Sequence, residues 1–103
     1  MVKIYLDDIR TAPDGWVRCH WPDEVIVYLR TGEVTELSLD HDLGDDLRGT
    51  GYDVLLWIEK EVREKNFTPP VMQVHSANGS ARQRMEAAIA SIQVYHSGKK
   101  FEQ

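Results

Sequence analysis

Residues 37–44 read Leu-Ser-Leu-Asp-His-Asp-Leu-Gly, so an apolar run ends abruptly in two acids and a histidine. The run from Val34 to Leu39 predicts a buried β-strand. In an open α/β sheet, ligands bind at the carboxyl ends of the parallel strands. At such an end, Asp40, His41 and Asp42 can hold a metal ion or form an oriented acid–base pair. The alternative is a turn in which the two aspartates accept hydrogen bonds from local amides.

Two other apolar runs end in groups of the same kind. The predicted strands are Val2 to Leu6 and Val71 to Val74, and the groups that follow them are Asp7, Asp8, His75, Ser76 and Asn78. Adjacent carboxylates such as Asp7 and Asp8 repel each other, and a divalent cation relieves this repulsion, although a solvated capping pair is the simpler interpretation. Ser76 and Asn78 fit equally well as phosphate donors at a helix start and as capping residues.

Helical signals lie between and after the predicted strands. Pro22 suits the first position of a helix, and Thr50-Gly-Tyr-Asp53 has the form of a capping box. Asn78 or Ser80 can cap a third helix. The resulting order β-α-β-α-β-α favours a parallel sheet with right-handed crossovers. Since all strands then run the same way, we expect the three polar ends to meet at one edge of the sheet.

Two further segments complete the predicted fold. Ile9 to Val17 contain proline and glycine turn signals and are predicted as a loop. Ile92 to Tyr95 fit a short additional strand at the edge of the sheet. Residues 1–96 are predicted to form a single domain, and residues 97–103 a disordered tail.

The composition limits the classes of ligand and compartment. The formal net charge is −5 and no basic stripe is visible, which argues against duplex nucleic acid as a partner. A small phosphorylated ligand held through a metal ion is compatible, because the cation supplies positive charge locally. The single cysteine, Cys19, predicts a reducing cytoplasm. No run approaches the roughly 20 apolar residues of a membrane span, and a homodimer is compatible with the chain.

Taken in order, four blocks resemble the cyclic-phosphate processing receiver domain family, a divergent branch of the receiver-like superfamily. The blocks are Leu6 to Arg10, Ser38 to Gly44, Thr50 to Asp53 and His75 to Asn78. Together they extend the resemblance from about residue 4 to residue 90. It implies a short receiver-like, flavodoxin-like fold of the α/β class. That fold is a three-layer α/β/α sandwich around a mostly parallel sheet of three or four strands.

The resemblance and the residues together predict metal-dependent hydrolysis or processing of a cyclic nucleotide or other cyclic phosphate. The residues fall into three sets, for the metal, for proton transfer and for the phosphate. The divalent metal, Mg²⁺ or Mn²⁺, is assigned to Asp7, Asp8 and Asp40. Proton transfer is assigned to His41 and His75, with Asp42 orienting an imidazole. The phosphate is assigned to Arg10, Ser76 and Asn78.

Three alternatives stay open. Asp40 resembles the phosphoacceptor of signalling receivers, which makes a phosphoacceptor receiver the first alternative. Against it, the chain is short by at least one βα unit, and only Lys99 and Lys100 follow the last predicted strand. A non-catalytic module that sequesters a signalling nucleotide or contacts a protein partner is the second alternative. Hydrolysis by the two histidines without a metal is the third.

Overall fold

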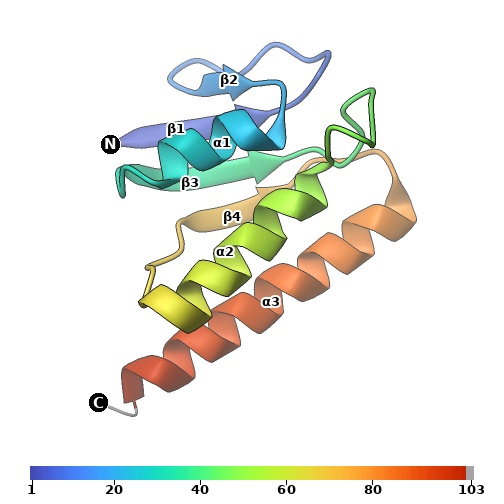
Figure 1. The fold of residues 1–103 in the computed structure, drawn as a ribbon. Helices are drawn as coiled ribbons and strands as arrows, with labels where there is room; N and C mark the ends of the chain where they lie inside the picture. Colours follow the sequence, from blue (N-terminus) through green and yellow to red (C-terminus); the bar gives the residue numbers. More distant parts are fainter. Residues whose placement is uncertain (102–103) are drawn as a thin grey trace.

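The computed structural model describes the backbone of residues 1–101 and the side chains of residues 1–98. The strands are β1 (Val2–Leu6), β2 (Val17–Cys19), β3 (Val34–Leu39) and β4 (Val71–Val74). The helices are α1 (Pro22–Leu29), α2 (Gly51–Lys65) and α3 (Gly79–Phe101). Figure 1 shows the strands side by side with their arrows pointing the same way, and α2 and α3 running beside one another.

The sheet has the order β2-β1-β3-β4, and every neighbouring pair in it is parallel. The three strands predicted from the sequence are confirmed at their predicted bounds. The three predicted helices are confirmed as well, with Thr50 and Asp53 forming the capping box of α2. The receiver-like α/β fold is therefore confirmed, in its four-stranded version.

The fourth strand differs from the prediction. It is β2, whose first residue lies in the segment predicted as a loop, and it pairs with β1 from Ile4 opposite Val17 to Leu6 opposite Cys19. The prediction of a short strand from Ile92 to Tyr95 is wrong, because these residues form part of α3. Ile92 is 1 % exposed and packs in the core as part of a helical face, which accounts for its apolar character.

The end of the chain also differs from the prediction. Residues 97–103 were expected to be disordered, but α3 continues through Gly98 as far as Phe101. Extending a helix that has already formed adds one hydrogen bond for each residue, which outweighs the weak helix propensity of one glycine. Residues 102–103 lie outside the part of the chain that the structure describes.

The hydrophobic core lies between the sheet and the helices. Its sheet side is formed by alternate strand residues: Ile4, Leu6, Leu37, Leu39 and Met72. Its helix side is formed by residues at helical spacing: Val25 and Leu29 of α1, Val54, Leu55, Ile58 and Val62 of α2, and Met85, Ile89 and Ile92 of α3. Because these side chains anchor the strands firmly, the strand ends form a rigid base for polar groups.

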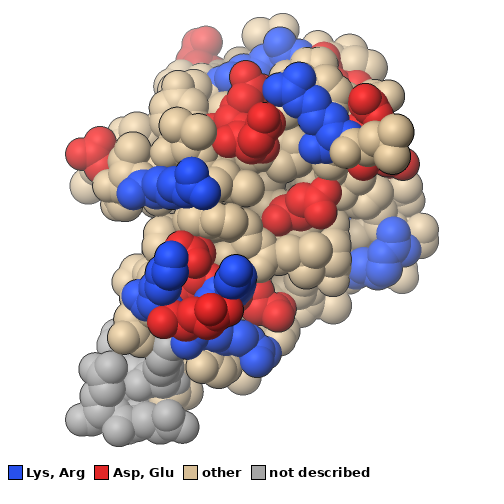
Figure 2. Space-filling view, in the orientation of Figure 1, with Lys and Arg blue, Asp and Glu red and all other residues tan. Residues whose placement is uncertain are grey.

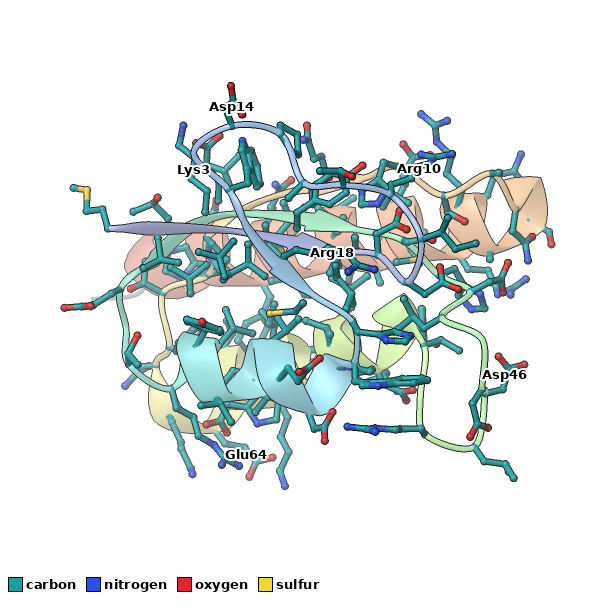
Figure 3. All side chains as sticks on the ribbon, turned by 90° about the horizontal axis from the view of Figure 1, so that it is seen from above. Lys3, Arg10, Asp14, Arg18, Asp46 and Glu64 are labelled. Carbon is teal, nitrogen blue, oxygen red and sulfur yellow. The ribbon has the colours of Figure 1, made fainter. Side chains whose placement is uncertain are left out.

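The opposite face of the sheet is covered by a loop, which stands where the second helical layer of the predicted sandwich would lie. Figure 3 shows residues 7–16 passing over the sheet on the side away from α1. Trp16 of this loop contacts Tyr5 edge to face, with ring centroids 6.4 Å apart, and Lys3 Nζ lies 5.8 Å from the Trp16 ring. Beside this loop, the strand residue Lys3 is exposed and Tyr5 is half-buried, whereas Ser38 on the same face is fully buried.

The surface charges are mixed. On the face that Figure 2 shows, Lys and Arg side chains alternate with Asp and Glu, most clearly over the helices. Such a surface carries no extended positive field of the kind that binds duplex nucleic acid. Among residues 1–101, no helix combines the length and apolar character that a membrane span requires.

Candidate functional site

The first residue after each strand is held in line with its neighbours by backbone hydrogen bonds. The amide of Asp40 donates to the carbonyl oxygen of Leu6 at 3.0 Å, and the amide of His75 donates to that of Leu39 at 2.9 Å. These bonds extend the parallel pairing of β1, β3 and β4 by one residue. Asp7, Asp40 and His75 therefore lie next to one another at the carboxyl edge, although they are far apart in the sequence.

A cavity of about 390 Å³ opens at this edge. Five of the residues that line it are charged, and the full lining is Asp7, Asp8, Ile9, Arg10, Asp40, Asp42, Gly44 and Ala77. Five of the nine residues predicted as site residues line it, whereas His41, His75, Ser76 and Asn78 do not. Figure 3 shows Arg10 at this end of the molecule and Lys3 and Asp14 at the other. A cavity of this size suits a small molecule.

Asp7 is the most deeply buried acid of the site, with a side chain 2 % exposed. Its Oδ1 accepts hydrogen bonds from the amides of Ile9 and Arg10, both at 2.8 Å, and its Oδ2 lies 3.0 Å from Nε2 of His75. Burial alone would raise the pKa of Asp7. The two amides and the His75 ring outweigh it, so the pKa lies below the ordinary value of 3.8. Asp7 is therefore a carboxylate that can only accept hydrogen bonds.

His75 is held on both ring nitrogens and on one face. Its Nδ1 lies 2.7 Å from Oγ of Ser38, which is 1 % exposed, while its Nε2 faces Asp7. The Tyr5 ring stacks on the imidazole with centroids 4.2 Å apart and planes 3° from parallel. Ser38 and Tyr5 lie opposite each other in the β1–β3 register, on the face of the sheet that the loop covers. The sequence-based prediction gave no role to Ser38 or Tyr5. The signal available for Ser38 was that it is a polar residue within an apolar, buried strand.

Asp7, Asp40 and His75 form a compact group of potential metal ligands. One ligand atom from each lies within 4.8 Å of the others. The pKa of Asp40 is raised, first by burial and then by the negative charges of Asp7 and Asp8, although the His41 amide opposes the shift. Asp8, predicted as a third carboxylate ligand, lines the same cavity but lies outside this group. The arrangement thus concentrates negative charge beside one imidazole.

A second histidine–aspartate pair lies at the rim. Nδ1 of His41 is 2.8 Å from Oδ1 of Asp42, and Nδ2 of Asn78 donates to Oδ2 of Asp42 at 3.4 Å. The hydrogen bond with His41, followed by that from Asn78, holds the pKa of Asp42 below its ordinary value despite some burial. Asp42 lines the cavity, and His41 contacts Asp42 without lining the cavity itself. This is the contact through which Asp42 would orient an imidazole, and that role stays a prediction.

The residues predicted to bind phosphate have local structural partners. Nη1 of Arg10 donates to the carbonyl oxygen of His75 at 3.2 Å, which places the guanidinium beside the cavity that Arg10 lines. Oγ of Ser76 accepts from the amide of Asn78 at 3.1 Å, and Oδ1 of Asn78 accepts from the amide of Ala81 at 3.2 Å. The capping alternative is thus realised for Ser76 and Asn78. Their contact with a phosphate stays a prediction.

The start of α2 packs unusually close to the end of β3. The amide of Gly51 donates to the carbonyl oxygen of His41 at 3.1 Å. A Cβ atom at Gly51 would overlap the carbonyl oxygen of Asp40. Glycine is therefore required here for close backbone approach. This contact fixes the backbone of Asp40 and His41 against a helix that is itself anchored in the core.

The loop between β3 and α2 is tied to the start of α1. Nε2 of His20 lies 3.1 Å from the carbonyl oxygen of Leu43, and the Arg48 guanidinium lies 4.5 Å from the Trp21 ring. The His20 and Trp21 rings are themselves stacked, with centroids 4.0 Å apart. These contacts hold the loop that carries Asp42 and Gly44 and so shape one wall of the cavity.

Comparison with known proteins adds one finding. The family model described as Cyclic-phosphate processing Receiver domain matches residues 2–91, which is most of the chain and includes every residue of the cavity wall. No curated protein and no solved structure matches the chain.

Proposed function

Because this chain belongs to the cyclic-phosphate processing receiver domain family, we propose that it hydrolyses a cyclic nucleotide or another small cyclic phosphate, using a divalent metal ion. The observation that carries the proposal is the meeting of Asp7, Asp40 and His75 beside a cavity of about 390 Å³. Two carboxylates and an imidazole within ligand distance of one another are a common donor set for a catalytic metal.

The chemistry of the donor set fits such an ion. The pKa of Asp40 is raised by burial and by the charges of Asp7 and Asp8, so the site carries negative charge that its own residues do not balance. A divalent cation would offset that charge. Asp7, Asp40 and His75 are the proposed ligands, and Asp8 is a further carboxylate on the same wall. The bound ion would supply polarisation of a phosphoryl oxygen.

Other residues at this edge of the sheet would bind the phosphate and move protons. Arg10 lines the wall and has guanidinium N–H groups beyond the one that His75 accepts, so it would bind a phosphoryl oxygen. Asn78 and Ser76, at the start of α3, would assist it. The pair His41 and Asp42 would take one proton from the attacking water as the new P–O bond forms. It would then return a proton to the ring oxygen that leaves, so that one water is added and a phosphomonoester results.

The test is a panel of cyclic nucleotides and 2′,3′-cyclic phosphates, incubated with Mg²⁺ or Mn²⁺ and with a chelator, and read by ³¹P NMR for phosphomonoester. We expect metal-dependent product from at least one substrate. The variant Asp40→Asn should lose at least about 100-fold in rate, since it removes a proposed metal ligand. Asp14→Asn removes the same charge from an exposed loop at the other end of the molecule and should keep wild-type activity. The absence of both turnover and binding across the panel would refute the proposal.

Two other results would favour the alternatives. Binding of a cyclic nucleotide without product under every metal would indicate a sequestering module. A mass increase of one phosphate on treatment with acetyl phosphate and Mg²⁺, lost in Asp40→Asn, would indicate a phosphoacceptor receiver. Against that last alternative, no lysine among residues 1–98 lines the cavity. Lys99 and Lys100 lie some 20 residues along α3, roughly 30 Å from the helix start that adjoins the site.

A further inference from the structure

The imidazole of His75 is held more completely than a proton-transfer group requires. Its Nε2 faces Asp7, its Nδ1 faces Ser38, and one face lies against Tyr5. The side chain is 15 % exposed, and Asp7 and Ser38 are almost fully buried. Because both ring nitrogens have a partner, the orientation of the imidazole is fixed. This favours a role for His75 as a metal ligand over a role as a group that exchanges protons with the substrate.

For a neutral imidazole, the two contacts of His75 favour one tautomer. Asp7 is a carboxylate and can only accept, so Nε2 of a neutral His75 carries the hydrogen and donates it to Oδ2. Nδ1 is then the acceptor, and the Ser38 hydroxyl donates to it. If a cation takes Nε2 as a ligand, that hydrogen must leave Nε2, and Nδ1 must carry one instead. A hydroxyl both donates and accepts, so Ser38 can serve either tautomer.

We propose that His75 is a metal ligand whose tautomer switches on binding, and that Ser38 is the positioning residue that makes this switch possible. In consequence, the imidazole biases the site toward an ion that accepts nitrogen, such as Mn²⁺ or Zn²⁺, over Mg²⁺. The inference rests on the metal site of the proposed function and deepens it. It assigns roles to Ser38 and to Tyr5, whose stacking keeps the ring plane fixed in both states.

The bias follows from the preferences of the ions. Mg²⁺ takes oxygen ligands almost exclusively, whereas imidazole is a good ligand for Zn²⁺ and other first-row transition metals. A site of carboxylates alone would discriminate less. Residues that hydrogen-bond the second nitrogen of a ligand histidine typically change metal affinity by about 10- to 100-fold. Ser38 stands in that position relative to His75.

The first test measures binding of Mg²⁺, Mn²⁺ and Zn²⁺ to the metal-free protein by calorimetry. We expect His75→Gln, which replaces the imidazole by an amide, to reduce the preference for Zn²⁺ over Mg²⁺ by at least about tenfold. The matched control is His96→Gln, which changes a histidine on α3 outside the cavity wall. An unchanged ratio of Zn²⁺ to Mg²⁺ affinity in His75→Gln would overturn the inference.

Ser38 is tested by its own series. Ser38→Ala should weaken Mn²⁺ and Zn²⁺ binding by about tenfold, and Ser38→Thr, which keeps the hydroxyl, should restore much of it. Thr35→Val is the control on the same strand. It removes a hydroxyl that contacts the carbonyl oxygen of Val2 and not His75, so metal affinity should not change. Equal affinities in Ser38→Ala and the wild type would remove Ser38 from the proposal.

The second test needs no variant. The ¹⁵N chemical shifts of His75 in the wild type report which ring nitrogen carries the hydrogen. We expect hydrogen on Nε2 without metal and on Nδ1 with Zn²⁺, and a ring that keeps hydrogen on Nε2 at saturating Zn²⁺ would refute the switch. This result is independent of turnover. A switch without cyclic-phosphate hydrolysis would refute the proposed function alone, and hydrolysis without a switch would refute this inference alone.

Discussion

Among residues 1–98, two histidine–aspartate pairs lie at the same sheet edge, and they differ in the chain separation of the partners and in the exposure of the aspartate. His75 and Asp7 are 68 residues apart in the chain and lie 3.0 Å apart, with side chains 15 % and 2 % exposed. His41 and Asp42 are neighbours in the chain and lie 2.8 Å apart, with side chains 16 % and 59 % exposed, so the pairs differ in the aspartate and not in the histidine. The first pair joins two strands. The second belongs to a single loop.

This difference in burial suggests that the His75–Asp7 pair supports the fold, whereas the His41–Asp42 pair can change without loss of the fold. Removing one partner of a buried pair leaves the other without a hydrogen bond and costs the full desolvation of that group. An exposed pair contributes at most about 1 kcal/mol, because water replaces the lost partner. Stability and activity should therefore respond together at His75 and separately at His41.

The largest effect is expected for His75→Asn. The shorter amide cannot reach both Ser38 and Asp7, so at least one of these two buried polar groups loses its contact with residue 75. We expect the free energy of unfolding to fall by about 2–3 kcal/mol, measured by urea denaturation without metal. The affinity of the variant for metal ions should also fall. A variant as stable as the wild type would show that water replaces the imidazole, and the two pairs would then not differ as proposed.

A smaller and more selective effect is expected for His41→Asn. If the His41–Asp42 pair moves the proton, kcat should fall about 100-fold, which is a typical contribution of general acid–base catalysis. The free energy of unfolding should change by less than about 1 kcal/mol, because the pair is partly exposed. His96→Asn, the same substitution on α3, is the control for both measurements. Unchanged turnover in His41→Asn would leave this pair without a catalytic role.

The same comparison explains what the sequence could predict. The pairing of His41 with Asp42 is a contact between neighbours, so local reasoning was enough to expect it. The meeting of Asp7, Asp40 and His75 followed from strand direction alone, because parallel strands end at one edge. These predictions used only the order of the elements and the polar ends of the apolar runs.

The contacts of Ser38 and Tyr5 with His75 were beyond that reasoning. They depend on the register of β1 against β3 and on which strand face each side chain takes, and a one-residue shift of either strand would have moved its own residue to the core side. The strand β2 was missed for another reason. It has three residues, two of them exposed, so it carries no alternation that separates it from a loop.

The smallest effect on the free energy of unfolding, and the one most sensitive to pH, is expected for Asp40→Asn. The pKa of Asp40 is raised in the folded state, by burial and by Asp7 and Asp8, so its ionisation opposes folding. That cost is absent below the unfolded pKa of about 3.8 and grows as the pH rises through the folded value. Without metal, the variant should therefore be more stable than the wild type at pH 7, by less than about 1 kcal/mol, and equal to it near pH 3.

Asp7 sets the opposite trend and provides the internal check. Its pKa is lowered in the folded state, so its contribution to stability is present above pH 3.8 and is lost as the pH falls through the folded value. Acid should therefore still destabilise Asp40→Asn, through Asp7, while the advantage over the wild type disappears. Saturating Mn²⁺ should reverse the order at pH 7, because binding stabilises only the protein that keeps its ligands. Asp14→Asn, with the same charge change, should follow the wild type in urea denaturation at every pH. A gain in Asp40→Asn that persists at pH 3 would mean that Asp40 destabilises the fold for a reason other than its charge. A gain that survives saturating Mn²⁺ would mean that Asp40 does not bind the ion.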